Sequence, residues 1–106
     1  MSIEIIQFQL AKDRLTMRLG ERLHVKLEAG WDPPSDGGAE DVRFFCRPSS
    51  YSVEPASMTV TVPDEGESVT VAFRLRVTGS ESGLVEIFAE AIESSSVDSI
   101  GLRVEK

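Results

Sequence analysis

Cysteine, histidine and long apolar runs are scarce in this chain of 106 residues, and asparagine is missing altogether. A single cysteine excludes an intramolecular disulfide, and without asparagine there is no acceptor for N-glycosylation. Unbroken apolar runs stop at two or three residues, so we expect no membrane insertion. The first residues show no basic stretch followed by an apolar block, so no signal peptide is expected. The sparse cysteine favours a reducing, cytoplasmic compartment, unless the chain is a fragment of a larger secreted protein.

Motifs that carry catalytic chemistry are also missing. The chain has one histidine, which gives no basis for a Ser/His/Asp arrangement. There is no phosphate-binding glycine loop, no HExxH helix and no Cys/His cluster for zinc. His24 alternates with charged neighbours and is interpreted as a solvated strand residue. We therefore expect a protein that is not an enzyme and needs no cofactor.

The charge balance argues against nucleic acid as a partner. The formal net charge is −7 and the isoelectric point is about 4.6, whereas nucleic-acid binding depends on neutralising phosphates. The charge is uneven, because residues 1–26 carry five basic and three acidic side chains while residues 27–106 carry six and fifteen. This asymmetry predicts one positive face on an otherwise negative module.

Period-two alternation dominates the chain. Residues 22–29 and 69–77 alternate apolar and polar side chains without a fault, as half-buried strands do. Turn signals separate such runs about every ten residues, which is typical of a two-sheet sandwich. With 41% hydrophobic and 27% charged residues, the composition fits a globular fold. The sequence predicts one all-β domain over residues 1–106, an antiparallel immunoglobulin-like β-sandwich of seven to eight strands.

Five segments need separate interpretation. Residues 84–93 fit an amphipathic helix as well as a strand. We favour the strand, because ten residues make a marginal helix and a strand here can pair directly with residues 97–105. Residues 3–10 change parity, which suggests an edge strand that changes partner sheet. Residues 48–55 are expected to form a short edge strand or crossover, and residues 30–41 a loop that cannot be a strand. The turn after Pro63 is expected to join 57–62 to 68–77 as a hairpin.

A family resemblance covers most of the chain. The stretches LTMRLGERLHVKLEA and SMTVTVPDEGESVTVAFRLRVTGSESGLVEIFAEA resemble immunoglobulin-like and fibronectin-III-like modules appended to bacterial multidomain proteins. The chain departs from antibody domains, which have a cysteine pair and a core tryptophan, since Trp31 stands at the head of a loop. The resemblance implies a non-catalytic spacer or binding module and transfers no functional residue.

Two weaker candidates concern loop ligands. Carboxylates on a loop suit Ca²⁺, and the longest connection contains four of them: Asp32, Asp36, Glu40 and Asp41. A second acidic group lies at Asp64, Glu65 and Glu67. Trp31 and Tyr51 are candidates for stacking on a sugar, although a tryptophan beside Pro33 and Pro34 also fits a plug over the end of the sandwich. The alternative function is therefore a Ca²⁺-binding or carbohydrate-binding module. The plainer interpretation of the acids is that they keep exposed loops soluble.

The alternation places two large aromatic side chains on an outer face. If Phe44 and Ile87 point inward, Phe45 and Phe88 point outward, and in an immunoglobulin-like sandwich their strands are neighbours. An aromatic centre with a charged rim is typical of a protein contact. The predicted contact, to a protein partner or a second copy of this chain, consists of Phe45, Phe88, Arg43, Arg47, Glu86 and Glu90. The alternative is that another part of the same chain covers the two rings.

Two further predictions follow from side-chain parity, the first together with the immunoglobulin-like topology that the resemblance implies, in which residues 22–29 and 69–77 are adjacent. The outward side chains of residues 22–29 and 69–77 are expected to form a positive patch on the sheet opposite the two phenylalanines, made of Arg22, His24, Lys26, Arg74 and Arg76. Cys46 shares the parity of Val42 and Phe44, so its thiol is expected to be buried and slow to react.

Overall fold

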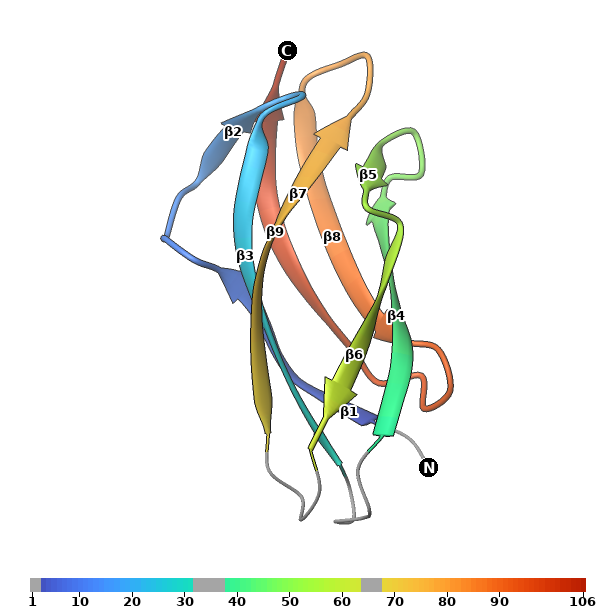
Figure 1. Ribbon diagram of the computed structural model, residues 1–106. Helices are drawn as coiled ribbons and strands as arrows, with labels where there is room; N and C mark the ends of the chain where they lie inside the picture. Colours follow the sequence, from blue (N-terminus) through green and yellow to red (C-terminus); the bar gives the residue numbers. More distant parts are fainter. Residues whose placement is uncertain (1–2, 32–37, 64–67) are drawn as a thin grey trace.

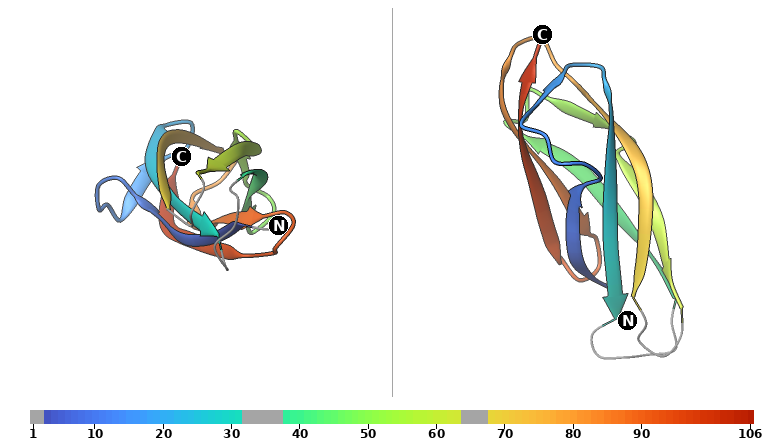
Figure 2. Two further views of the ribbon diagram at one scale, coloured as in Figure 1. Left: turned by 60° about the horizontal axis from the view of Figure 1, so that its bottom comes forward. Right: turned by 90° about the vertical axis from the view of Figure 1, so that its left-hand side faces the viewer.

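The computed structural model describes residues 3–31, 38–63 and 68–106, which form nine β-strands in two sheets (Figure 1). The four-stranded sheet has the order β1-β3-β7-β5 and the five-stranded sheet the order β2-β9-β8-β4-β6. The two sheets pack face to face in an elongated sandwich (Figure 2). The strands are β1 (Ile3–Leu10), β2 (Thr16–Arg18), β3 (Arg22–Trp31), β4 (Gly38–Arg47), β5 (Ser52–Glu54), β6 (Ser57–Val62), β7 (Val69–Thr78), β8 (Gly83–Ala91) and β9 (Val97–Glu105).

The core is made of the inward side chains of both sheets. Along β3, Leu23, Val25 and Leu27 are fully buried, while the residues between them face solvent or are half-buried. Three phenylalanines meet in the middle of the sandwich, with ring centroids 5.3 to 6.4 Å apart: Phe8, Phe44 and Phe73. The all-β, two-sheet prediction is therefore confirmed by the arrangement of the described residues. The strand count is nine, not seven to eight, because β2 and β5 are strands of only three residues. The prediction of antiparallel pairing is wrong for β2, which pairs with β9 in parallel.

The ambiguous segment after Gly83 is a strand. β8 pairs with β9 through the short connection predicted at residues 93–96, and with β4 on its other side. Val85, Ile87, Ala89 and Ala91 all lie in the core. The two neighbouring strands offer a full set of backbone hydrogen-bond partners, which outweighs the helix propensity of alanine and glutamate.

The parity change in β1 comes from a bulge and not from a change of sheet. β1 pairs only with β3, and the register shifts between Ile5 and Gln7. The extra residue turns the following side chains over, so Ile3, Ile5 and Phe8 are all buried while Ile6 is exposed. The prediction that this edge strand changes its partner sheet is therefore wrong, because its backbone hydrogen-bond ladder is formed with the four-stranded sheet.

Side chains of β9 and of the connection between β8 and β9 instead close the free edge of β1. The N–H of Ile5 donates to Ser96 Oγ (2.9 Å), and that of Phe8 to a carboxylate oxygen of Asp98 (2.8 Å). The hydroxyl of Ser94 donates to the carbonyl of Ile3 (2.7 Å). An edge strand needs such cover because its unpaired backbone groups otherwise attract another strand.

Two predictions about connections need correction. β6 pairs with β4, and β7 belongs to the other sheet, so the hairpin predicted between 57–62 and 68–77 is wrong. A local turn signal cannot distinguish a hairpin from two successive strands that belong to different sheets, as β6 and β7 do. The segment 30–41 was predicted to be entirely loop, but β3 extends to Trp31 and β4 begins at Gly38. Within 48–55 the prediction is confirmed, because β5 is an edge strand on the crossover from β4 to β6.

No described part of the chain forms a helix of the length and apolar character needed to cross a membrane.

Candidate functional site

The outer face of the five-stranded sheet carries a stacked pair of aromatic rings. Phe45 on β4 and Phe88 on β8 are direct cross-strand partners. Their ring centroids are 5.0 Å apart and their planes differ by 7°. Strand alternation places them there, since Phe44 and Ile87 beside them are buried. The predicted cross-strand pair is therefore confirmed as a geometric feature.

Two arginines cover the rings. The guanidinium carbon of Arg43 lies 4.7 Å from the centroid of Phe45, and that of Arg47 lies 5.4 Å from the centroid of Phe88. Cations at this distance interact favourably with an aromatic face. The two rings are consequently half-buried, and not the freely exposed apolar surface that alternation alone suggests. We call Arg43, Phe45, Phe88 and Arg47 the Phe–Arg stack.

Two glutamates complete the predicted set. Arg43 donates through Nε to Oε1 of Glu90 at 2.6 Å. Glu86 is the cross-strand partner of Arg47 and accepts a hydrogen bond from Ser99 Oγ at 2.8 Å. The sheet therefore brings together all six residues predicted for a protein contact. Charged groups border an aromatic centre, as at the rim of many protein interfaces.

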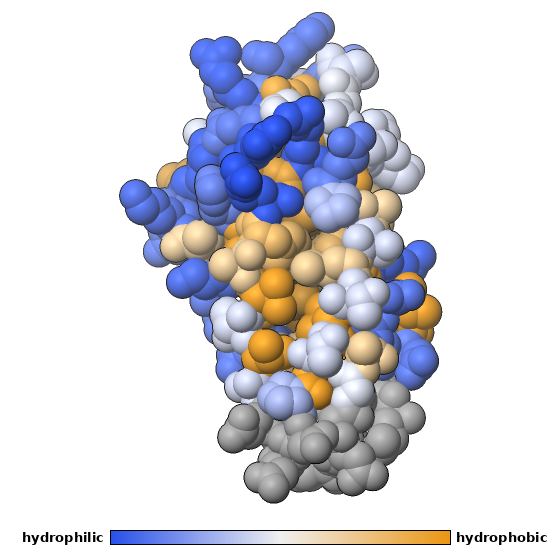
Figure 3. Space-filling model, in the orientation of Figure 1, coloured by the Kyte–Doolittle hydropathy of each residue, from blue (hydrophilic) through white to orange (hydrophobic). Residues whose placement is uncertain are grey.

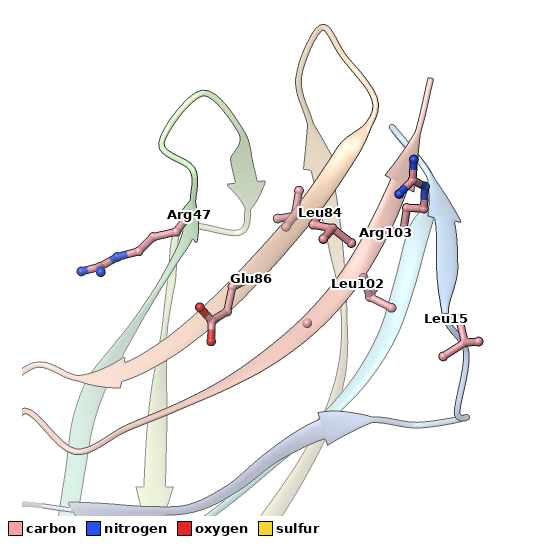
Figure 4. A pocket seen from close by; sticks show the side chains of 8 residues that line it. Leu15, Arg47, Leu84, Glu86, Leu102 and Arg103 are labelled. Atoms are coloured by element: carbon pink, nitrogen blue, oxygen red, sulfur yellow. The ribbon is translucent and has the colours of Figure 1, made fainter.

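A shallow hollow of about 480 Å³ lies on the same face of this sheet, between Arg47 on β4 and Arg103 on β9 (Figure 4). Its floor includes Leu84 and Gly101, and Arg47 and Arg103 contribute to its border. Leu84 is 72% exposed and Leu15 is 87% exposed. The position of Leu84 was available from strand parity, because it shares a face with Glu86 and Phe88. Alternation over residues 15–19 predicts that Leu15, Met17 and Leu19 face the core. The prediction is wrong for Leu15, which precedes β2, and correct for Met17, which is buried.

The calcium candidates do not converge in the described residues. Glu40 is buried, and its carboxylate accepts hydrogen bonds from the N–H groups of Ile3 (3.0 Å) and Glu93 (3.3 Å). Asp41 is on the opposite face of β4 and accepts from Thr59 Oγ1 at 2.7 Å. Glu40 thus links β1 to the five-stranded sheet, and this role could not be predicted from the sequence because its partners are far away along the chain. Asp32, Asp36, Asp64, Glu65 and Glu67 lie outside the described residues. Among residues 3–31, 38–63 and 68–106, no group of three potential metal ligands is present.

The tyrosine proposed for sugar stacking is part of the fold. Tyr51 is buried, and its hydroxyl donates to the carbonyl of Glu81 at 2.8 Å. Its ring lies against Gly79, where an added Cβ would come within 2.7 Å of Cδ1. Tyr51 therefore packs the β4–β5 turn against the β7–β8 connection, and its ring is not open to a ligand. The side chain of Trp31, the other aromatic candidate, lies outside the described residues.

The predicted positive patch is confirmed on the outer face of the four-stranded sheet. β3 and β7 are neighbours, and the register places Arg22 opposite Arg76 and His24 opposite Arg74. Lys26 follows on β3, and all five side chains are exposed. Because the Phe–Arg stack belongs to the other sheet, the two features occupy opposite faces of the sandwich. We call Arg22, His24, Lys26, Arg74 and Arg76 the basic strip.

Cys46 lies in the core, as predicted. Burial raises the pKa of its thiol to about 11, because an apolar environment disfavours the thiolate. We expect native protein at pH 8 to react with a thiol reagent far more slowly than urea-unfolded protein. Labelling of the native state at the rate of a free thiol would contradict this expectation.

The raised pKa also predicts a pH dependence of stability. An unfolded thiol titrates near about 8.5, so above that pH the unfolded state binds fewer protons than the native state. The contribution of Cys46 to the free energy of unfolding should therefore fall as pH rises from about 8.5 toward 11. Urea titrations of the parent and a Cys46→Ala variant across this range measure it, and parallel pH profiles would refute it.

Comparisons with known proteins identify a shared fold. No family model and no curated protein sequence matches the chain significantly. Among solved structures, the chain is similar to the β-glucosidase of Listeria innocua, with a TM-score of 0.62 and 23% identity. The same values hold for a mutant of that enzyme in complex with laminaribiose and for its complex with glucose. In each case the alignment covers 98% of this chain but only 16% of the enzyme chain.

Proposed function

We propose that this chain is a non-catalytic interaction or spacer module, of the immunoglobulin-like or fibronectin-III-like kind, within a larger protein or assembly. The observation that carries the proposal is the Phe–Arg stack, a pre-formed aromatic and cationic centre on two central strands. The unequal coverage of the comparisons supports a modular role, since a fold of this kind forms a small part of a longer enzyme chain.

The chemistry of the Phe–Arg stack suits a protein surface. The side chains are already ordered by stacking and by the Arg43–Glu90 ion pair, so little conformational freedom is lost when a partner docks. Aromatic and arginine side chains are the residues that most often dominate binding energy at interfaces. Leu84 and Leu15 extend the apolar surface beside the stack. Opposite charges on neighbouring strands suit a second copy of this chain related by a two-fold axis.

The non-catalytic part of the proposal draws on the placement of the two most reactive side chains. His24 is exposed on the four-stranded sheet, and the Cys46 thiol is buried between the sheets. A nucleophile and its base must be within hydrogen-bond reach of each other, and these two residues face different environments. Hydrolysis of an aryl β-glucoside by the isolated chain would contradict this part.

We predict that a Phe45→Ser, Phe88→Ser double variant loses association and keeps its fold. Each ring is expected to contribute at least about 2 kcal/mol to binding, as interface hot spots do. The loss of the ring–ring interaction costs the fold about 1 kcal/mol, and the loss of two half-buried rings costs about 1.5–3 kcal/mol more, which is less than the total stability of about 5–15 kcal/mol expected of such a domain. Sedimentation velocity over a concentration series should show dimers of the parent chain and monomers of the double variant.

An Ile6→Ser variant is the control, because it removes an exposed apolar side chain from the other sheet. It should associate like the parent chain. Unfolding of the double variant would mean that the two rings belong to the core. A parent chain that stays monomeric at high concentration would contradict self-association. The expected partner of this face would then be a different protein.

A further inference from the structure

The basic strip is costly to the fold that carries it. Arg22 and Arg76 are direct cross-strand partners on β3 and β7, and Glu54 of β5 is the cross-strand partner of Arg76 on its other side. Like charges in directly opposite positions destabilise a sheet. The chain has 18 acidic residues, yet among the described residues the salt bridges involve other cations, namely Arg14, Arg43 and Arg103. Stability of the sheet therefore does not explain why these cations are gathered there.

Two hollows in the surface are lined by residues of the basic strip. A hollow of about 450 Å³ is lined by Arg22, Arg74 and Arg76, together with Glu54 and Pro55. A second hollow of about 490 Å³ lies toward the segment after β1 and is lined by Lys12, Arg14, His24 and Lys26, with Ala11 and Leu23. Figure 3 shows strongly hydrophilic side chains gathered over the upper parts of β3 and β7. Cations that line hollows beside a low-dielectric core attract anions more strongly than cations on a convex surface.

The spacing of the cations matches one kind of anion. Outward side chains along a strand repeat at every second residue, about 6.6 to 6.8 Å apart. Arg74 and Arg76 form such a pair of cations on β7, beside Arg22 and Lys26 on β3. Carboxylates at alternate positions of an extended peptide have the same repeat. Arginine also presents a planar fork that binds a carboxylate with two parallel hydrogen bonds.

The charge around the strip limits the length of the ligand. The whole chain is at −7, and Glu54 lines one of the two hollows beside the strip, so a long uniform polyanion such as a nucleic acid or a polyuronate would be repelled by the chain as a whole. A short acidic segment can be neutralised within the strip. Charge complementarity and spacing together favour a polypeptide.

We propose that the basic strip binds an extended acidic polypeptide segment with carboxylates at alternate positions. The segment lies over the outer face of β3 and β7, on the opposite side of the sandwich from the Phe–Arg stack. The proposal stands independently of that stack, because the two faces share no residue. It gives the chain a second binding surface with a different chemistry.

Fluorescence anisotropy of the whole chain with a labelled peptide of alternating glutamate and threonine, about five residues long to match the strip, tests the proposal. An Arg22→Gln, Arg76→Gln variant should bind about tenfold more weakly, because exposed ion pairs each contribute a few-fold in affinity. The matched control is Arg18→Gln, Lys106→Gln, which makes the same change of charge on β2 and just after β9 of the five-stranded sheet and should bind like the parent. Binding of the parent should weaken as salt is raised.

Thermal unfolding shows whether each variant is folded. The strip variant should be at least as stable as the parent, since it removes a pair of opposed like charges. An Arg76→Gln single variant supplies a second measurement if the double variant unfolds. Sedimentation of the strip variant should be unchanged, which separates this proposal from the one for the Phe–Arg stack.

Four results would overturn the proposal. The parent chain does not bind the peptide at low salt, or the control variant weakens binding as much as the strip variant. A peptide of the same composition with its glutamates in one block binds equally well, so spacing plays no part. A polyuronate or a single-stranded oligonucleotide binds more tightly than the peptide, so the strip selects another class of polyanion.

Discussion

Replacing Ile87 by alanine is expected to lower the free energy of unfolding by about 2–5 kcal/mol, as deletion of a buried isoleucine or leucine side chain does. Ile87 is completely buried in β8, with Cys46 and Ile100 as its cross-strand partners. Its loss leaves a cavity between two sheets whose strands are held by hydrogen bonds on both sides, so little collapse can fill it. A domain of this size has about 5–15 kcal/mol in total. Urea unfolding followed by circular dichroism measures the change.

The matched control is Leu84→Ala on the same strand. Leu84 is 72% exposed, so its truncation should change the free energy of unfolding by less than about 0.5 kcal/mol. The pair also tests the strand against the helix, because a helix over residues 84–93 would place Leu84 and Ile87 on one apolar face. Equal losses for both variants would contradict the strand.

Replacing Glu40 by alanine is expected to destabilise the chain by about 1–3 kcal/mol, the cost of leaving buried hydrogen-bonding groups unpaired. The carboxylate accepts hydrogen bonds from Ile3 of β1 and from Glu93 after β8. Without it, the first residues of β1 lose a link to the opposite sheet. Amide hydrogen exchange at Ile3 should accelerate more than exchange in the middle of β3, and urea unfolding gives the global loss.

Two companion variants sharpen the test. Asp41→Ala changes the neighbouring carboxylate, which is exposed and bonded to Thr59, and should cost less than about 1 kcal/mol. Glu40→Gln retains one acceptor oxygen and should fall between the parent and Glu40→Ala. Similar stability of Glu40→Ala and Asp41→Ala would show that Glu40 does not fasten β1.

Wherever a strand is regular, the sequence by itself determined which side chains point inward and which point outward. The alternation of residues 22–29 and 69–77 correctly placed the basic strip outward and Leu23, Val25 and Leu27 inward. It also placed Cys46 in the core and Phe45 and Phe88 on an outer face, where the strand order of an immunoglobulin-like sandwich predicted that the two rings are neighbours. Parity is a local property, because successive side chains of an extended backbone point to opposite sides.

The partners of each strand and the surroundings of each side chain were decided by the tertiary structure. The bulge in β1, the crossing between β6 and β7 and the burial of Glu40 depend on segments far apart in the chain. The same is true of the arginines that cover the two phenylalanines, since their positions depend on the register of β4 and β8. A local pattern specifies the side of the strand to which a side chain points. The residues that it contacts there depend on which strands pair and in which register, and many alternative strand orders and registers are compatible with the same local pattern.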